Sequence, residues 1–577
     1  MLLALAGHSG TIRHGGSLEN PREWNRSSRF ISDAGAHHPQ TGQDKFQGAV
    51  AARVSASDSW NSQLPWLFAW RLCSFYAPQG DLAVSTSLWE ALSQLPELNL
   101  IFFVLALLVA FGFEFVNGFH DTANAVTTVI YTGTLKPTPA VFYSGFCNFL
   151  GVLLGGTAVA FGIVNLLPVE LLIDSASVRA IVMVVSLLLA GLTWNLATWW
   201  YGLPVSSSHT LIGSILGVGL ANSLITRGNV SGVNWAKAVE VGLSLLVSPL
   251  IGFLAASVLL LTMKRFLREP RLYHPPGEGD NPPHWVRWVL LATCGGVSVA
   301  HGSNDGQKGM GLILLVLIGF LPTYYALDLH HPKRAQDVRE AAVAIRDIIS
   351  KEKPGPSTPG ILDQLDAIID GLKGKTSFAE VQPSARWATR QAIYRFRQDL
   401  AMGGLSPAAY KAIAPHRDQF ARSIEYVPTW VVIGVALALG IGTTIGYKRI
   451  VVTVAEKIGK SHLTYAQGAS AEVVAALTIG LADAVHMPVS TTHVLSSGVA
   501  GTMWANNSGI QGETVRKIGL VWVTTLPAAI LLAATLFTLG GLLIPNAGPP
   551  AKPRPGVSSE LERHSIAKVV RPGYAWR

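Results

Sequence analysis

The sequence is poor in charged residues and in cysteine, and each shortage excludes a class of protein. Only 14% of its 577 residues are charged and 49% are hydrophobic, whereas about 25% of a typical soluble domain is charged. The three cysteines, Cys73, Cys147 and Cys294, form no CxxC pair, which excludes a disulfide framework and a cysteine-rich zinc site. The composition therefore argues against a soluble enzyme and favours a helical membrane protein.

The net charge of +9 does not require nucleic acid as a partner. In membrane proteins, basic residues gather in the cytoplasmic loops and set the orientation of the chain. The basic segments at 264–287 and 448–460 are typical of such loops. We expect both to be cytoplasmic, and we expect no nucleic acid to bind.

The apolar residues form long blocks, and a helix needs about 20 residues to cross the hydrocarbon core of a bilayer. The blocks lie at 100–131, 139–166, 178–201, 204–222, 236–263, 289–321, 429–447, 465–486, 489–506 and 518–544. They predict an all-α, polytopic membrane protein.

Two blocks, 100–131 and 289–321, are too long for one straight crossing and too short for two. Each carries an aspartate, Asp121 in the first and Asp305 in the second. Unwound backbone is tolerated at membrane depth where it lines a cavity inside the protein. We predict that each block is one helix broken near its middle.

Two other blocks, 204–222 and 489–506, differ from ordinary spans. They open at Pro204 and Pro488, are rich in Ser, Thr and Gly, and directly follow a full span. We predict that each is a re-entrant hairpin.

Outside the apolar blocks, three segments have the composition of soluble chain. Residues 1–90 are polar with no periodic apolar face, so we expect a disordered N-terminal extension. Residues 323–428 carry apolar residues at helical spacing between charges, which predicts a soluble all-α insert. The tail at 545–577 is basic and rich in proline, and we expect it to be disordered. The membrane part is then 98–322 and 429–544.

The membrane part contains an internal repeat. The motif PVSSSHTL at 204–211 returns as PVSTTHVL at 488–495, and GFHDTANA at 118–125 has a counterpart in HGSNDGQKG at 301–309. The aspartate precedes the proline by 83 residues in the first copy and by 183 in the second, and the difference is about the length of the insert. We expect two inverted halves, of which residues 98–322 hold the first and the start of the second. Broken helices in corresponding positions of two halves indicate a secondary transporter with its site at the repeat interface.

Ionisable residues inside a span are expensive and therefore indicate function. Asp121 and Asp305 lie beside Asn, Gly, Ser and Thr, and such oxygen-rich groups suit a hard cation or a proton. The hydroxyl residues after each proline, together with the backbone N–H groups of a helix start, suit an anion. They are Ser206, Ser207 and Ser208 in the first copy and Ser490, Thr491 and Thr492 in the second. Such hydroxyls also bond back to their own helix in many membrane proteins.

Further ionisable residues near the motifs are candidates for proton transfer or coupling, namely Glu114, His120, Lys308, His209 and His493. Glu114 lies seven residues before Asp121, on the same helical face. Lys308 can neutralise Asp305 or contact an anion. The two hairpin histidines can bind metal, carry protons or only satisfy the hairpin.

These motifs, in this order, resemble the inorganic phosphate transporter (Pit) family, and within it the bacterial PitA-like low-affinity branch. The resemblance covers residues from about 100 to 544. It implies an inverted-repeat fold, inorganic phosphate as substrate and cation-coupled symport. It also implies that Asp121, Asn124, Asn304 and Asp305 lie at the ion and phosphate site, with the hairpin hydroxyls beside them.

The chain departs from the family motif Gly-x-Asn-Asp-x-x-Asn-Ala at a few positions. His120 replaces the usual Asn in the first copy, and Gln307 and Lys308 replace the Ala-Asn part in the second. The departures agree with the PitA-like branch, which is similar to proton symporters of a neutral divalent metal–phosphate complex. The resemblance further implies a multi-pass protein of the bacterial inner (plasma) membrane, surrounded by lipid and compatible with a homodimer.

Other functions remain open at this stage. A sulfate or other oxyanion permease and a sodium-coupled phosphate symporter are the alternatives within transport. A membrane enzyme would use Asp121 and Asp305 as general acid and base, but the sequence carries no nucleophile elbow or HExxH motif. A receptor or scaffold built on the insert would not explain acidic residues in both long blocks. We expect no enzymatic activity and no resident cofactor.

Overall fold

The computed structural model describes residues 89–544 apart from 90, 94, 165–177, 231–232, 234, 278–280, 352–357, 402–404 and 486. Within these residues the chain is helical, with no strand and one isolated bridge between Gly459 and Ile510. The predicted extension at 1–90, except for Trp89, and the predicted tail at 545–577 lie outside the described residues.

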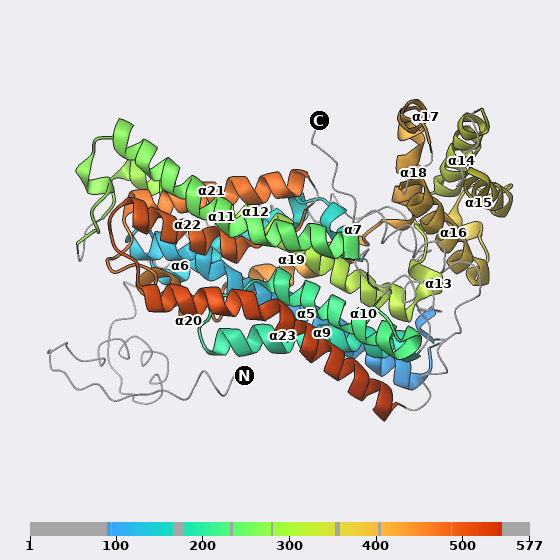
Figure 1. Cartoon of the computed structure of the whole chain (residues 1–577), viewed down its shortest axis with the longest axis horizontal. Helices are drawn as coiled ribbons and strands as arrows, with labels where there is room; N and C mark the ends of the chain where they lie inside the picture. Colours follow the sequence, from blue (N-terminus) through green and yellow to red (C-terminus); the bar gives the residue numbers. More distant parts are fainter. Residues whose placement is uncertain are drawn as a thin grey trace, which may run out of the picture. The chain divides into compact units, whose positions relative to one another are not determined.

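The helices of the first half follow the apolar blocks closely and are coloured from blue to green in Figure 1. They are α5 (Glu97–Tyr131), α6 (Pro137–Leu154), α7 (Ala158–Val164), α9 (Val178–Trp200), α10 (Ser207–Arg227) and α11 (Trp235–Phe266), followed by the short η1 (Pro270–Leu272).

The second half begins with α12 (His284–Phe320) and resumes after the insert. Its later helices are α19 (Thr429–Thr443), α20 (Lys448–Glu456), α21 (Tyr465–Ala484), α22 (Thr491–Ala505) and α23 (Gly512–Leu543). The last helices of the two halves, α11 and α23, are both 32 residues long, and each contains an internal proline, Pro249 or Pro527.

The two blocks that we expected to be broken helices are continuous, so this prediction is wrong. Helix α5 runs unbroken for 35 residues and α12 for 37 residues, which is over 50 Å at about 1.5 Å per residue. Neither helix contains a proline, and their polar side chains find partners on neighbouring helices, so the backbone hydrogen bonds need not open. Most of their glycines lie against other helices: a Cβ on Gly302 would meet the backbone of Asn148 in α6.

Each Pro-Val-Ser motif forms the turn before a helix. Gly202 has a φ of +65° after α9, and α10 begins at Ser207 behind the N-cap Ser206. In the second copy α22 begins at Thr491 behind the N-cap Ser490. Both helix starts contact the middle, not the ends, of α5 and α12, as described below. The placement of these hairpins within a membrane stays a prediction.

The helices of the two halves are interleaved. Helix α10 packs along α23 of the other half, and α22 packs along α11. Gly217 and Gly501, which are 284 residues apart like Pro204 and Pro488, make these contacts close. A Cβ on Gly217 would meet the backbone of Ile530, and one on Gly501 would meet the backbone of α11. Each half therefore supports the hairpin of the other.

By length and composition, six of the described helices can cross a membrane. They are α5, α6, α9, α10, the Leu246–Phe266 part of α11, and α23. A seventh candidate is the pair Ala414–Ile424 and Thr429–Thr443, which is bent by 72°. These helices support a polytopic membrane protein.

The segment between α12 and α19 forms small helices that pack on one another. They are α13 (Pro322–Tyr325), α14 (Arg334–Ser350), α15 (Thr358–Gly371), η2 (Phe378–Glu380), α16 (Pro383–Ala401), α17 (Pro407–Ala412) and α18 (Ala414–Ile424). Arg390 of α16 is buried and donates to the carbonyl oxygens of Ala326 and Ile424, at 2.7 and 2.9 Å. Burial lowers the pKa of Arg390 to about 10, and the two carbonyls stabilise its charge.

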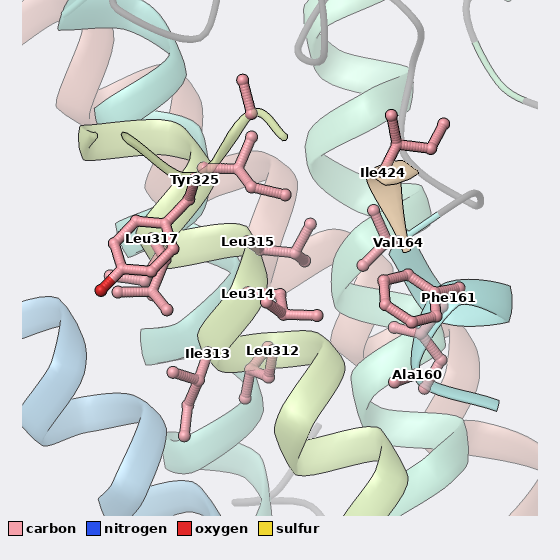
Figure 2. Packing of buried hydrophobic residues seen from close by; sticks show 14 of the residues in the cluster. Ala160, Phe161, Val164, Leu312, Ile313, Leu314, Leu315, Leu317, Tyr325 and Ile424 are labelled. Carbon is pink, nitrogen blue, oxygen red and sulfur yellow. The ribbon is translucent and has the colours of Figure 1, made fainter. Parts of the chain in front are cut away.

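An apolar cluster connects this segment to the membrane part. Figure 2 shows Leu312, Leu314 and Leu315 of α12 beside Phe161 and Val164 of α7, with Ile424 of α18 nearby. The C-terminal third of α12 is buried on all sides. This helix therefore lies in the core, and the polar residues near its middle are held away from lipid.

Candidate functional site

The candidate site lies where four helices meet: the middle of α5, the middle of α12, and the first turns of α10 and α22. The two long helices supply carboxylates, and the two short helix starts supply hydroxyls. The first N–H groups of a helix have no partner within the helix and carry the positive end of its dipole. Both helix starts can thus attract negative charge to the same place.

Asp121 of α5 accepts hydrogen bonds from both hairpins. Ser207 Oγ donates to Asp121 Oδ2 at 3.1 Å, and Thr491 Oγ1 donates to the same oxygen at 3.4 Å. Thr492 Oγ1 donates to Asp121 Oδ1. One buried carboxylate therefore joins the first half to residues from both copies of the Pro-Val-Ser motif.

Asp305 of α12 is fully buried and lies beside Asp121. Its Oδ2 accepts from Asn117 Nδ2 at 3.2 Å and from Ser207 Oγ at 3.4 Å. Its Oδ1 accepts from Lys308 Nζ at 2.6 Å. Ser207 Oγ thus lies within hydrogen-bond distance of both aspartates, one from each half, and its single proton is shared between them.

His301 of α12 stands between the two carboxylates. Its Nε2 lies 3.4 Å from Asp305 Oδ2 and 3.8 Å from Asp121 Oδ2. Its Nδ1 lies 2.8 Å from Asn148 Oδ1, and that amide oxygen can only accept, so Nδ1 carries a proton. In the neutral ring the lone pair of Nε2 then faces both aspartates, whereas the protonated ring forms an ion pair with them.

These three side chains can hold a metal ion. The ligand atoms of Asp121, His301 and Asp305 lie within 4.8 Å of one another and are buried. Two carboxylates and an imidazole whose second nitrogen is fixed by an amide are a common donor set for divalent metals. A small pocket opens beside them and is lined by Asp121, Asn148, His301 and Thr491, with apolar side chains around it.

Lys308 adds a positive charge beside the carboxylate of Asp305. Its Nζ donates to Asp305 Oδ1 and Ser208 Oγ, both at 2.6 Å, and to the carbonyl oxygen of Val489 at 3.0 Å. The side chain is only 3% exposed. Lys308 therefore pairs with Asp305, the first of the two roles that the sequence left open.

The two N-cap serines, Ser206 and Ser490, have a structural role. Ser206 Oγ accepts from the backbone N–H of His209, and Ser490 Oγ accepts from that of His493, each at 3.2 Å. They fix the helix starts that present Ser207 and Thr491.

Other predicted residues lie near the site without joining the aspartates. Asn304 donates to Asp483 Oδ1 of α21 at 3.0 Å, so its side chain lies toward α21. His209 and His493 face each other with ring centroids 4.6 Å apart, and His493 stacks on Trp522 at 4.0 Å. Asn124 lies in α5, and its side chain is not among those described.

Glu114 and His120, both on α5, lie near the two aspartates. His120 Nδ1 is 3.7 Å from Asp121 Oδ1, and its Nε2 is 3.4 Å from Thr198 Oγ1. Glu114 is fully buried, and one of its oxygens accepts from Asn117 at 3.5 Å. Asn117 also donates to Asp305, so it links Glu114 to the centre of the site.

The sequence reasoning ranked His301 low and did not identify Asp483 or Asn148. His301 is four residues before Asp305, on the same helical face, and this spacing could have identified it. Asp483, which accepts from Asn304, is an acidic residue inside the apolar block at 465–486, which also could have indicated it. Asn148 holds His301 from another helix, and nothing in the sequence indicates that contact.

Comparison with known proteins gives one consistent result. The model of a family described as the phosphate transporter family matches residues 117–533. The low-affinity inorganic phosphate transporter PitB of Escherichia coli K12 is 40% identical over 483 residues, which cover 76% of this chain and 97% of that protein. PitA of the same strain is 40% identical over 479 residues, covering 76% and 96%.

More distant similarities extend over the same part of the chain. A probable low-affinity inorganic phosphate transporter of Bacillus subtilis is 27% identical over 443 residues, covering 76% of this chain and 98% of that protein. A solved structure described as the sodium-dependent phosphate transporter has a TM-score of 0.46 and 20% identity, covering 77% of this chain and all of that chain.

Proposed function

Because the chain belongs to the phosphate transporter family, we propose that it is a secondary active transporter that carries inorganic phosphate across the membrane. The observation that carries this proposal is the meeting of Asp121 and Asp305 with the hydroxyls of both helix starts. This arrangement joins anion-binding donors to acidic side chains at a buried point between two repeated halves.

Phosphate fits this site better than sulfate for a chemical reason. At neutral pH phosphate retains at least one proton, so it can donate a hydrogen bond to Asp121 or Asp305. Sulfate carries no proton, and an ionised carboxylate can only accept. Sulfate would therefore leave a carboxylate facing an anion without a hydrogen bond, which disfavours it.

We propose that phosphate crosses as a complex with a divalent metal. The cluster of Asp121, His301 and Asp305 provides the ligands for the metal of this substrate, and the hydroxyls of Ser207, Thr491 and Thr492 provide donors for the phosphate. In the structure these hydroxyls donate to the aspartates. Entry of the metal would compete for the carboxylate oxygens and release the hydroxyls for phosphate.

The proposed mechanism is proton symport by alternating access in the bacterial inner membrane. The meeting of both repeated halves at one buried site, through Asp121 and Asp305 and through α10 and α22, is the arrangement on which alternating access around a fixed site is built. Besides Lys308, which pairs with Asp305, the buried groups near the aspartates that can exchange a proton are Glu114, His120 and His301. A sodium-coupled symporter is the alternative for the coupling ion.

The test is uptake of labelled phosphate by the purified full chain in proteoliposomes. We expect saturable uptake that needs a divalent metal and that excess sulfate leaves unchanged. Empty liposomes and protein carrying Asp305→Asn serve as controls. Competition by sulfate at equal concentration would favour the oxyanion permease, and absence of any uptake would leave a membrane enzyme or receptor as the better interpretation.

A further inference from the structure

The ammonium of Lys308 is enclosed by oxygen atoms in a way that resembles the coordination of a free cation. Its three donors are directed to three different kinds of oxygen: the carboxylate of Asp305, the hydroxyl of Ser208 and the backbone carbonyl of Val489. An ammonium group has three donors and no acceptor. All three are therefore used, and no donor is left for an anion.

These oxygen types are the ligands that hard cations prefer in proteins. The three atoms belong to three separate segments, since Asp305 is on α12, Ser208 is in the first turn of α10, and Val489 precedes α22. A cation at this point consequently ties one long helix to both hairpins. The lysine does this with a charge that is attached to the chain and cannot leave.

The internal repeat shows that this attached charge belongs to only one copy. Lys308 follows Asp305 by three residues, and the residue three positions after Asp121 is Asn124. The two copies thus differ at this position by a cation in one and a neutral amide in the other. Burial of the Lys308 side chain, which is 3% exposed, excludes a merely solvated lysine.

We propose that Lys308 is a built-in replacement for a monovalent cation: its ammonium fills a cation site made by Asp305, Ser208 and Val489, and removal of the side chain opens that site to sodium, potassium or ammonium. The inference deepens the proposed function, because it explains why this chain would transport phosphate without sodium. The site itself is defined by the three oxygens and does not depend on the identity of the substrate.

The experiment compares two variants of the full chain. Lys308→Ala removes the cation and leaves space, whereas Lys308→Met keeps the volume and removes only the charge. Lys517→Ala is the matched control, because Lys517 also pairs with an acidic residue, Glu513, but is 63% exposed on α23. The first measurement is the midpoint of thermal unfolding in detergent, in chloride salts of sodium, potassium or ammonium, with N-methylglucamine chloride as the reference at equal ionic strength.

We expect Lys308→Ala to be stabilised by at least one of the three cations, with a midpoint raised by roughly 5 °C at saturation. The unchanged chain, Lys308→Met and Lys517→Ala should show no such shift. Adding Ser208→Ala to Lys308→Ala removes one ligand and should raise the cation concentration that gives half of the effect. Equal midpoints in all salts, or an equal shift in Lys308→Met, would overturn the proposal.

The second measurement is phosphate uptake, which in Lys308→Ala should become at least tenfold dependent on the cation that stabilises it. If Lys308→Ala does not fold, Lys308→Asn, which copies the residue of the first repeat, replaces it. A variant that folds only with the cation supports the site, and one that is unfolded in every salt contradicts it. Failure of the unchanged chain to transport phosphate would contradict the proposed function alone, since the unfolding measurement needs no transport.

Discussion

At the scale of single residues, the site is a set of buried charges that satisfy one another. Two aspartates face one lysine and two histidines, His120 and His301, and all five are buried. A buried charge is tolerated when it is paired and hydrogen-bonded, and removing one partner of a buried pair typically costs about 3–5 kcal/mol. Substitution of any of these residues should therefore impair the protein, and the effect of each substitution can be measured separately.

The two aspartates should be essential for transport. Asp121→Asn and Asp305→Asn each remove a carboxylate that can accept from phosphate or bind a metal, and we expect uptake to fall at least about 100-fold, or about 2.7 kcal/mol. Insertion should be retained, because removing a charge from a span eases insertion. Uptake in proteoliposomes and the amount of protein in the membrane fraction check both parts.

The control for these variants is Asp366→Asn, because the Asp366 side chain is 47% exposed and pairs with Arg346 away from the site. It should transport normally. Normal uptake in Asp121→Asn or Asp305→Asn would show that the aspartates have only a packing role.

His301 should determine the metal requirement. His301→Gln removes the imidazole that lies between the two carboxylates, and we expect the metal concentration for half-maximal uptake to rise at least about tenfold, or about 1.4 kcal/mol. The exposed His284 at the start of the same helix gives the control His284→Gln. A slower uptake with an unchanged metal requirement would mean that His301 only supports the fold.

At the scale of helices, glycine decides how closely the two halves approach. The GxxxG spacing at Gly151 and Gly155, like that at Gly213 and Gly217, predicts close packing. A Cβ on Gly151 would meet the backbone of Val299 in α12, and one on Gly213 would lie 2.8 Å from the carbonyl oxygen of Leu526 in α23. Both contacts are with backbone, which cannot move aside like the end of a side chain.

Alanine at the equivalent glycines should therefore destabilise the protein. We expect Gly217→Ala and Gly501→Ala each to cost about 1–3 kcal/mol, as overpacking typically does, because the added Cβ would collide with the backbone of α23 or α11. A lower midpoint of thermal unfolding in detergent checks this. Gly519→Ala in α23 has open space around its Cβ and should unfold normally, and equal midpoints for all three variants would contradict the packing argument.

At the scale of the whole molecule, the two halves contribute unequally to one site. The first half supplies Asp121 with His120 beside it, and the second supplies Asp305 with His301 beside it, but only the second adds a lysine that contacts an aspartate. A fixed ammonium repels a second cation at 4 Å by about 4 kcal/mol at the effective dielectric near a protein surface. This asymmetry disfavours a free sodium ion at Asp305 Oδ1, the oxygen with which Lys308 pairs, and supports the proposed coupling to a proton.

Transport should consequently depend on the proton gradient. We expect phosphate uptake in proteoliposomes to rise when the outside is acidified, to collapse with a protonophore, and to require a divalent metal. Replacement of sodium by potassium at constant pH should change nothing, because Lys308 already provides the positive charge. If removing sodium stopped uptake, the proton assignment would be wrong.

The sequence by itself determined the membrane character, the positions of the helices and the duplication. These properties are local or periodic: a long apolar block predicts a helix whatever surrounds it, and two copies of Pro-Val-Ser are visible without any structure. The helices begin and end within a few residues of most of the apolar blocks, and the helices α10 and α22 start three residues after Pro204 and Pro488, as a proline followed by a serine cap predicts.

Only the tertiary structure decided how the polar residues are used. The sequence could not show whether the polar residues in the middle of α5 and α12 interrupt the helix or form hydrogen bonds with other helices. The answer depends on side chains 80 to 370 positions away, such as Ser207 and Thr491 for Asp121. For the same reason it ranked His301 too low, because Asn148 and Asp121 approach that ring from other helices. Hydropathy and motifs depend on the residues of one segment, whereas the pairing of buried charges depends on how several helices pack against one another.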